Sequence, residues 1–182
     1  MEKFFLEVTS WYHWDAMLIA LAIMLILAIP AYIYGRGKRK HAVKLKQAKT
    51  VFKKIKTIES FPQSIAYLRK IDPYVYEELI LYALKKTGYK IQRNKKYSGD
   101  GGIDGKVWIK GKLNYVQAKR YSKHINKAHV KEFNHITERD KVDGLFIHTG
   151  TTGKGSRSEL AQNIQMISGE KMVKLIKGIN VL

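Results

Sequence analysis

The order of apolar and polar residues divides the chain into a long apolar run, a basic amphipathic stretch and a mixed globular part. Residues 16–34 contain no charged side chain. A helix of that length spans roughly 28 Å, close to the hydrocarbon thickness of a bilayer. Aromatic residues flank the run, as they do at membrane interfaces: Trp11, Tyr12, Trp14, Tyr32 and Tyr34. The pattern predicts a transmembrane helix rather than a buried core helix.

The charges on the two sides of this run predict its orientation. Residues 1–15 hold three acidic residues and one lysine, so they lack the positive first region of a cleaved signal peptide. Residues 36–40, after the run, read Arg-Gly-Lys-Arg-Lys. Because positive segments stay on the cytoplasmic side, we expect residues 1–15 to be extracytoplasmic and the rest to lie in the cytoplasm. We therefore expect a single-pass protein of the inner (cytoplasmic) membrane with its N-terminus outside.

Residues 35–70 form a basic neck with 12 Lys and Arg and a single acid, Glu59. Its apolar residues recur mostly at three- and four-residue steps, typical of an amphipathic helix: Val43, Ala48, Val51, Phe52, Ile55 and Ile58. The neck either binds anionic lipid headgroups or is a solvated spacer, and the sequence favours these two roles equally. Contact with DNA is the third interpretation. Pro62 lies near the start of the globular part, residues 71–182, so we expect residues 60–182 to suffice for activity.

From Asp72 onward the pattern alternates between helix and strand periods. Helix start signals, among them Asp72 before Pro73 and a capping box of Ser156 with Glu159, predict helices over 72–88, 126–137 and 156–167. Apolar runs between turn residues predict strands over 89–95, 103–110, 112–120, 144–148 and 173–176. This order defines an α/β domain.

The turn and the apolar pattern of the central hairpin, strands 103–110 and 112–120, predict which residues pair across it. A two-residue turn at Gly111 pairs apolar with apolar residues only if Asp104 lies opposite Gln117 or Lys119. All three side chains then project from one face of the sheet. The hairpin therefore predicts a carboxylate, an amide oxygen and an ammonium group close together.

These three groups suit the hydrolysis of a phosphodiester. Mg²⁺, or Mn²⁺ in its place, takes protein oxygens, waters and substrate phosphate as ligands and lowers the pKa of a bound water. A nearby ammonium, here Lys119, orients that water or neutralises developing charge. Glu77 completes the site if the first helix of the domain packs on the hairpin. Spacing alone leaves an ordinary solvated strand face as the equal alternative.

The segments YEELILYALKKTGY, SGDGGIDG and YVQAKRYS, in this order and spacing, resemble the catalytic domain of Mrr-type restriction endonucleases, within the PD-(D/E)XK nuclease superfamily. The resemblance covers roughly residues 72–182. It implies a restriction-endonuclease-like core, a mixed central sheet flanked by helices, here preceded by one transmembrane helix. It also implies an acidic metal ligand, a Gln-x-Lys pair and a helix glutamate, at Asp104, Gln117, Lys119 and Glu77, with Glu78 as second choice.

The chain departs from the family pattern in two ways. Gln117 stands where the wider superfamily usually has a carboxylate, which predicts weaker metal binding that depends more on Asp104 and Glu77; Mrr-like proteins share this glutamine. A separate DNA-recognition domain is replaced by the apolar run and the neck, so DNA sequence or modification specificity does not carry over. Asp100, in the same motif, is expected to form the turn or to support the ligands.

The charge of the chain supports DNA binding, and its composition excludes several kinds of site. The net charge is +19, and residues 71–182 carry +10 (21 basic minus 11 acidic residues), enough to dock DNA phosphates. The predicted DNA contacts are Arg120, Lys123, His124, Lys154 and Arg157. The chain has no cysteine, which excludes disulfides and a Cys nucleophile. GTTGKGS fails the Walker A pattern at His148, so we expect no nucleotide cofactor.

Together these observations predict a membrane-anchored, Mg²⁺-dependent DNA endonuclease, restriction-like and of type IV character. The alternative is a catalytically inactive, membrane-tethered DNA-binding protein. A lipid-binding membrane protein whose soluble domain recognises other proteins is a third hypothesis. The sequence leaves the oligomeric state open, with a homodimer as one option because cutting both strands usually needs two active sites.

Overall fold

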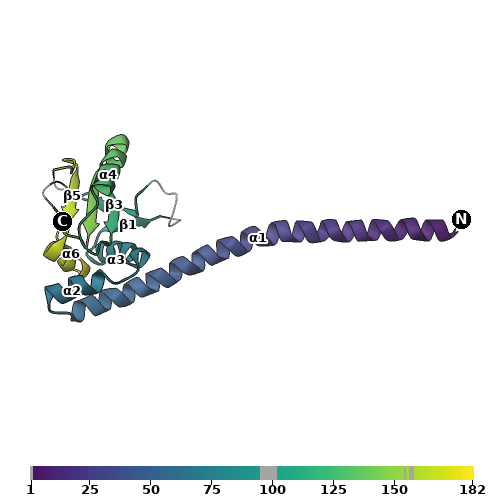
Figure 1. The fold of residues 1–182 in the computed structure, drawn as a ribbon, viewed down its shortest axis with the longest axis horizontal. Coiled ribbons are helices and arrows are strands. Elements are labelled where there is room, and N and C mark those ends of the chain that lie inside the picture. Colours follow the sequence, from purple (N-terminus) through teal and green to yellow (C-terminus); the bar gives the residue numbers. More distant parts are fainter. Residues whose placement is uncertain (1, 95–101, 154, 156–157) are drawn as a thin grey trace. The chain divides into compact units, whose positions relative to one another are not determined.

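The structure is a computed structural model that describes residues 2–94, 102–153, 155 and 158–182 (Figure 1). Its contacts divide the chain into two units, residues 1–42 and 43–182. Helix α1 (Glu2–Thr57) contributes to both, because its first part makes up unit 1 and its last part belongs to unit 2.

Unit 1 consists of the helical residues before position 43. The large apolar side chains from Met17 to Ile29 are 51–68% exposed. Within the described part of the chain, no helix is long and apolar enough to cross a membrane. The transmembrane helix predicted at 16–34 is therefore not supported. Helix α1 continues without interruption through Pro30 and Tyr34 into the residues of the neck.

Unit 2 includes most of the stretch that the sequence assigned to a neck. Ala48 and Ile55 of α1 and Leu68 of α2 (Phe61–Leu68) are fully buried, in one cluster with α3 (Pro73–Lys86) and α6 (Gly169–Ile176). The boundary predicted at residue 71 thus lies inside the unit. The physical reason is that Ala48, Val51, Phe52 and Ile55 of the apolar stripe pack into the protein core, whereas Val43 at its start is exposed.

A five-stranded mixed sheet forms the centre of unit 2. Its strands follow in spatial order along the chain: β1 (Lys90–Arg93), β2 (Gly105–Ile109), β3 (Lys112–Lys119), β4 (Asp143–His148) and β5 (Ile164–Ile167). β1, β2 and β3 pair antiparallel, whereas β3, β4 and β5 pair parallel. One face packs on α3 and α6, and the other on α4 (Lys127–Asp140). The α/β prediction with a mixed sheet is confirmed.

Local signals account for the best-predicted elements. The Asp72 carboxylate accepts a hydrogen bond of 3.1 Å from the Val75 backbone nitrogen and so caps α3. The hairpin turns at Lys110 and Gly111, which both adopt left-handed φ angles of 49° and 80°. Gly105 pairs with Val116, which is the register that sets Asp104 opposite Gln117.

The predictions for the last part of the chain are wrong. Residues 164–167, expected in a helix, form β5, and residues 173–176, expected as a strand, lie in α6. The other end of the predicted helix, at Ser156, lies outside the described residues. The short apolar run Met172–Ile176 suits either period, and its burial against the core at steps of one, three and four selects the helix.

Candidate active site

Asp104 lies immediately before β2 and forms two hydrogen bonds with the backbone of β3. Its backbone nitrogen donates to the Val116 oxygen at 2.8 Å. Its Oδ2 accepts from the backbone nitrogen of Ala118 at 2.6 Å. The carboxylate is therefore held beside the strand that carries Gln117 and Lys119, and the half-buried side chain stays within reach of a ligand.

Gln117, in the middle of β3, is 1% exposed and is oriented by one hydrogen bond. Its Nε2 donates to the carbonyl oxygen of Gly102 at 2.9 Å. Because that carbonyl can only accept, the amide must turn its nitrogen toward Gly102. The other end, Oε1, is buried and has no hydrogen-bond partner among the described residues. A buried acceptor left in this state costs about 1–3 kcal/mol, which a bound ligand would remove.

Helix α3 approaches the start of β2 closely at Gly105. A Cβ atom at this glycine would lie 2.7 Å from Cδ2 of Leu81 and 3.0 Å from the Gln92 oxygen, so a larger residue does not fit. Glu77 and Glu78 lie one helical turn before Leu81 on α3. The contact places the acidic turn of α3 near the start of β2, on the sheet face of Val107 and Val116. Gln117 lies on the opposite face, which packs on α4, so the packing of α3 does not by itself place Glu77 beside Gln117.

The two glutamates of α3 differ in their surroundings. Glu78 is 3% exposed, and its Oε2 accepts from Nε of Arg93 at 2.8 Å. Arg93 in turn pairs with Gly105 across the sheet. Glu77 is half-buried. The sequence did not indicate the Arg93–Glu78 pair, although a basic residue at the end of a polar strand offered a weak signal for it.

Lys119 is the last residue of β3 and shares the face of Gln117, two positions earlier. Its neighbour on β4 is His148, which is fully buried. Burial lowers the pKa of His148 to about 4, so the imidazole beside Lys119 is neutral near pH 7. The sequence used His148 only to reject a nucleotide-binding loop and gave no sign of its burial.

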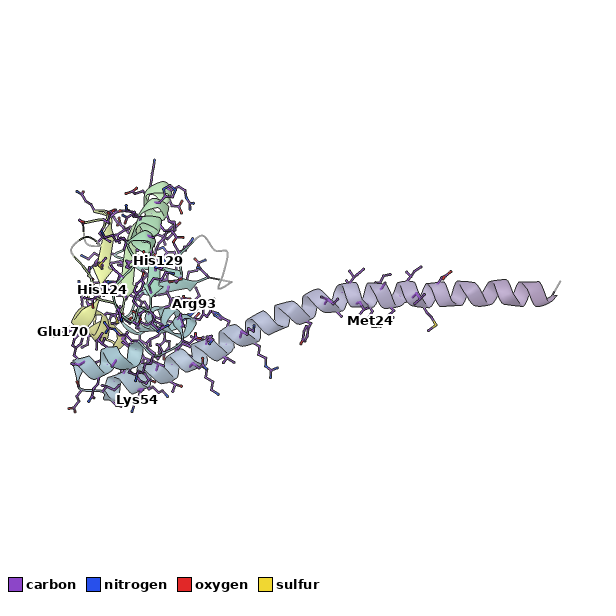
Figure 2. All side chains as sticks on the ribbon, in the orientation of Figure 1. Met24, Lys54, Arg93, His124, His129 and Glu170 are labelled. Carbon is purple, nitrogen blue, oxygen red and sulfur yellow. The ribbon has the colours of Figure 1, made fainter. Side chains whose placement is uncertain are left out.

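The predicted DNA contacts separate into two kinds. Arg120 is half-buried, and its Nη1 donates to the Arg69 oxygen at 2.6 Å, so it secures the end of α2. Lys123 and His124 are exposed on the segment after β3, which bridges to Thr151 (Figure 2). Lys154, Arg157 and also Asp100 lie outside the described residues. Among the described residues of this set, only Lys123 and His124 present their side chains to solvent as a phosphate contact requires.

The oxygen groups of this site include the carboxylate of Asp104 and the amide oxygen of Gln117. Across residues 2–94, 102–153, 155 and 158–182, no three His, Cys, Asp or Glu side chains cluster as a metal site. Carboxylate and amide oxygens nevertheless fit a hard divalent cation, and the buried Gln117 Oε1 on the face of Asp104 is such an oxygen without a partner. The donor chemistry is compatible with magnesium or manganese.

Fold and site define an α/β domain of the restriction-endonuclease kind. The chain belongs to the Mrr catalytic (Mrr_cat) family, described as a restriction endonuclease, whose model matches residues 68–176. This family indicates a nuclease, a hydrolase that acts on DNA, and confirms the Mrr-type resemblance. Among solved structures, restriction endonuclease FokI matches with a TM-score of 0.40 and 16% identity over 69% of this chain. The match spans only 32% of the FokI chain. No curated protein matches the chain.

Proposed function

We propose that the protein hydrolyses DNA phosphodiester bonds with the help of a divalent metal ion, Mg²⁺ or Mn²⁺. The observation that carries this proposal is the buried Oε1 of Gln117, which lacks a hydrogen-bond partner among the described residues and lies on the sheet face of Asp104. Family membership supports DNA as the substrate.

Each residue of the candidate site has a separate role in the proposed hydrolysis. Asp104, Gln117 Oε1 and Glu77 would hold the metal, which when bound lowers the pKa of a water and offsets charge on the phosphate. The Lys119 ammonium orients the attacking water or neutralises charge on the phosphate as the bond breaks. The backbone of β3 keeps the Asp104 carboxylate aimed by its 2.6 Å hydrogen bond.

Cleavage of DNA by the purified full chain tests the proposal. We expect cutting with Mg²⁺ or Mn²⁺ and none with EDTA. Asp104→Ala and Lys119→Ala should each lower the rate at least about 100-fold, the scale of losing one charge-stabilising group. The matched controls Asp143→Ala and Lys112→Ala remove exposed residues of the same types from the sheet and should cut normally. Wild-type rates for both site variants would overturn the site assignment.

The uncharged amide at position 117 favours one other function, a catalytically inactive DNA-binding protein. A neutral ligand holds a cation less strongly than a carboxylate does. Salt-sensitive DNA binding by the full chain without cleavage under either metal would select this function.

Membrane attachment and a cytoplasmic domain at the inner membrane form a separate proposal, supported by the sequence of residues 16–34 and the basic residues at 36–40. Fractionation of cells that express the full chain tests it. Retention in the membrane pellet after alkaline extraction is the expected result, and release into the supernatant contradicts it. A homodimer on duplex DNA is proposed on chemical grounds, and sedimentation of the complex as a monomer would exclude it.

A further inference from the structure

A second basic feature lies outside the candidate active site, where the last part of α1, the end of α3 and β1 come together within unit 2. It is a pocket of about 340 Å³. The residues that line it are Leu45, Lys49, Tyr82, Lys85, Lys86 and Arg93. The sequence considered lipid or DNA contact for the neck, which includes Lys49, but it singled out none of these residues. We call this group the α1–α3 pocket.

The charged residues that line the α1–α3 pocket are all positive. Four of its lining residues are cationic and none is acidic. Arg93 forms an ion pair with Glu78, whereas Lys49, Lys85 and Lys86 take part in no ion pair between described residues. Like charges gathered around one cavity repel each other, and an anion between them relieves the repulsion. The pocket is therefore suited to a phosphate group.

An aromatic ring forms a fixed part of the pocket wall. The ring of Phe52 packs edge-on against Tyr82, with centroids 5.0 Å apart. Nζ of Lys86 lies 5.6 Å from the centre of the Tyr82 ring. The ring holds the lysine near the pocket, which lowers the entropy lost when the ammonium meets an anion.

Arg93, labelled in Figure 2, connects the pocket to the start of β2. It lines the pocket, binds Glu78 and pairs with Gly105, the residue after Asp104. Along α3, Lys86 lies eight residues after Glu78, roughly 12 Å at 1.5 Å per residue. At about 3.4 Å of helix axis per nucleotide, this separation corresponds to about three to four nucleotides. The pocket therefore lies a few nucleotide lengths from the acidic turn of α3, and Arg93 links it to the start of β2.

We propose that the α1–α3 pocket binds backbone phosphates of the DNA substrate, a few nucleotides away from the bond that is cut. The inference rests on the proposed function for the identity of the neighbouring site. DNA is favoured over an anionic lipid headgroup because Arg93 joins the pocket directly to residues around Asp104. The pocket thus adds positive charge that positions DNA without reading its sequence.

DNA binding by the full chain in EDTA tests this inference apart from catalysis. The pocket variant combines Lys49→Gln, Lys85→Gln and Lys86→Gln and leaves Arg93 in place. The control combines the exposed residues Lys112→Gln, Lys171→Gln and Lys174→Gln, with the same change in net charge. Fluorescence anisotropy with a labelled duplex gives the affinity at several salt concentrations, and circular dichroism confirms that both variants fold.

We expect the pocket variant to bind at least about tenfold more weakly than the control at low salt. The slope of log affinity against log salt should fall by up to about 2.7, about 0.9 for each lost phosphate contact. Equal affinities and slopes for the two variants would overturn the inference, as would a lack of DNA binding by the unaltered chain.

Two further outcomes separate the competing explanations. If the pocket variant keeps its DNA affinity but loses binding to vesicles that contain anionic phospholipid, the pocket belongs to lipid and the inference is wrong. If the unaltered chain binds DNA through the pocket yet never cuts it with Mg²⁺ or Mn²⁺, the proposed nuclease function fails and the phosphate site stands. The binding measurement contains no metal, so the two failures are distinguishable.

Discussion

The side-chain nitrogen of Gln117 donates a hydrogen bond of 2.9 Å to the carbonyl oxygen of Gly102. A carbonyl oxygen offers no proton, so this position favours an amide over a carboxylate, which would set two acceptors against each other. The glutamine is therefore matched to its backbone neighbour. This relationship gives a structural reason for an amide rather than an acid at this position.

Gln117→Glu should destabilise the protein by about 1–3 kcal/mol near pH 7, because the buried carboxylate faces the Gly102 oxygen. A protonated carboxyl can donate to that oxygen, so folding raises the pKa of the introduced group. Stability relative to the wild type is then retained at low pH and lost as pH rises above about 4.3. Urea unfolding at several pH values measures this, with Gln165→Glu on the exposed part of β5 as control. A constant difference between the two proteins across pH would contradict the explanation.

Ile55→Ala should lower the free energy of unfolding by about 2–5 kcal/mol, because Ile55 is fully buried in the core of unit 2. Val43→Ala, on the same helix but 48% exposed, should change it by less than about 0.5 kcal/mol. Chemical denaturation compares the two variants. Equal effects would mean that the last part of α1 does not pack as the structure shows.

A fragment of residues 60–182 should fail to fold, contrary to the expectation from the sequence, because it lacks Ala48, Val51, Phe52 and Ile55 of the core cluster. A fragment of residues 40–182 keeps them and should show a cooperative thermal transition. Circular dichroism on both fragments makes the comparison. A folded, active 60–182 fragment would show that α1 is dispensable.

Arg120→Ala and Lys123→Ala should separate stability from DNA binding. Arg120 donates to the Arg69 oxygen from a half-buried position, so its loss should cost about 1–3 kcal/mol of stability. Lys123 is exposed, so its loss should weaken DNA binding and reduce the salt slope by about 0.9 with an unchanged melting temperature. Thermal melts and DNA titrations on the two variants test this. The reverse assignment of effects would show that Arg120 is the phosphate contact.

His148 should make the protein sensitive to acid. Burial lowers the pKa of its imidazole to about 4, below the usual 6.5, so between these values the unfolded chain binds more protons. The free energy of unfolding should therefore fall as pH is lowered from about 6.5 to about 4. His148→Phe retains a ring beside Tyr121 and Phe146 and should flatten this part of the profile. His124→Gln, at an exposed position, is the control, and an equally steep profile for His148→Phe would contradict the prediction.

Elements set by local rules were predicted well. The cap at Asp72, the turn at Lys110–Gly111 and the hairpin register depend on neighbours in sequence and on a period of two, which residue types reveal directly. The common face of Asp104, Gln117 and Lys119 follows from the same register. The sequence thus contains the central part of the candidate site.

What the sequence did not reveal depends on distant partners. The stripe that includes Val51, Phe52 and Ile55 has one pattern whether it meets lipid, solvent or a protein core, and only the tertiary contacts with α3 and α6 decide. β5 and α6 were exchanged because a four-residue segment with three apolar residues and one polar residue suits both periods. The Gly102 carbonyl that orients Gln117 is a backbone group, which every residue has, so the sequence does not indicate this contact.

The hydrogen bond from Lys177 Nζ to the Ile58 oxygen, 2.7 Å long, joins residues 119 positions apart. The entropy of closing such a loop grows only with the logarithm of its length, so the cost in stability is modest, but contacts of this range slow folding. On the ribosome, the apolar side chains of the last part of α1 emerge early, whereas α6, which shares a core cluster with them, is made more than 100 residues later. Until translation passes residue 177, that helix presents an uncovered apolar stripe among lysines, and this is the period in which a chaperone would bind the nascent chain.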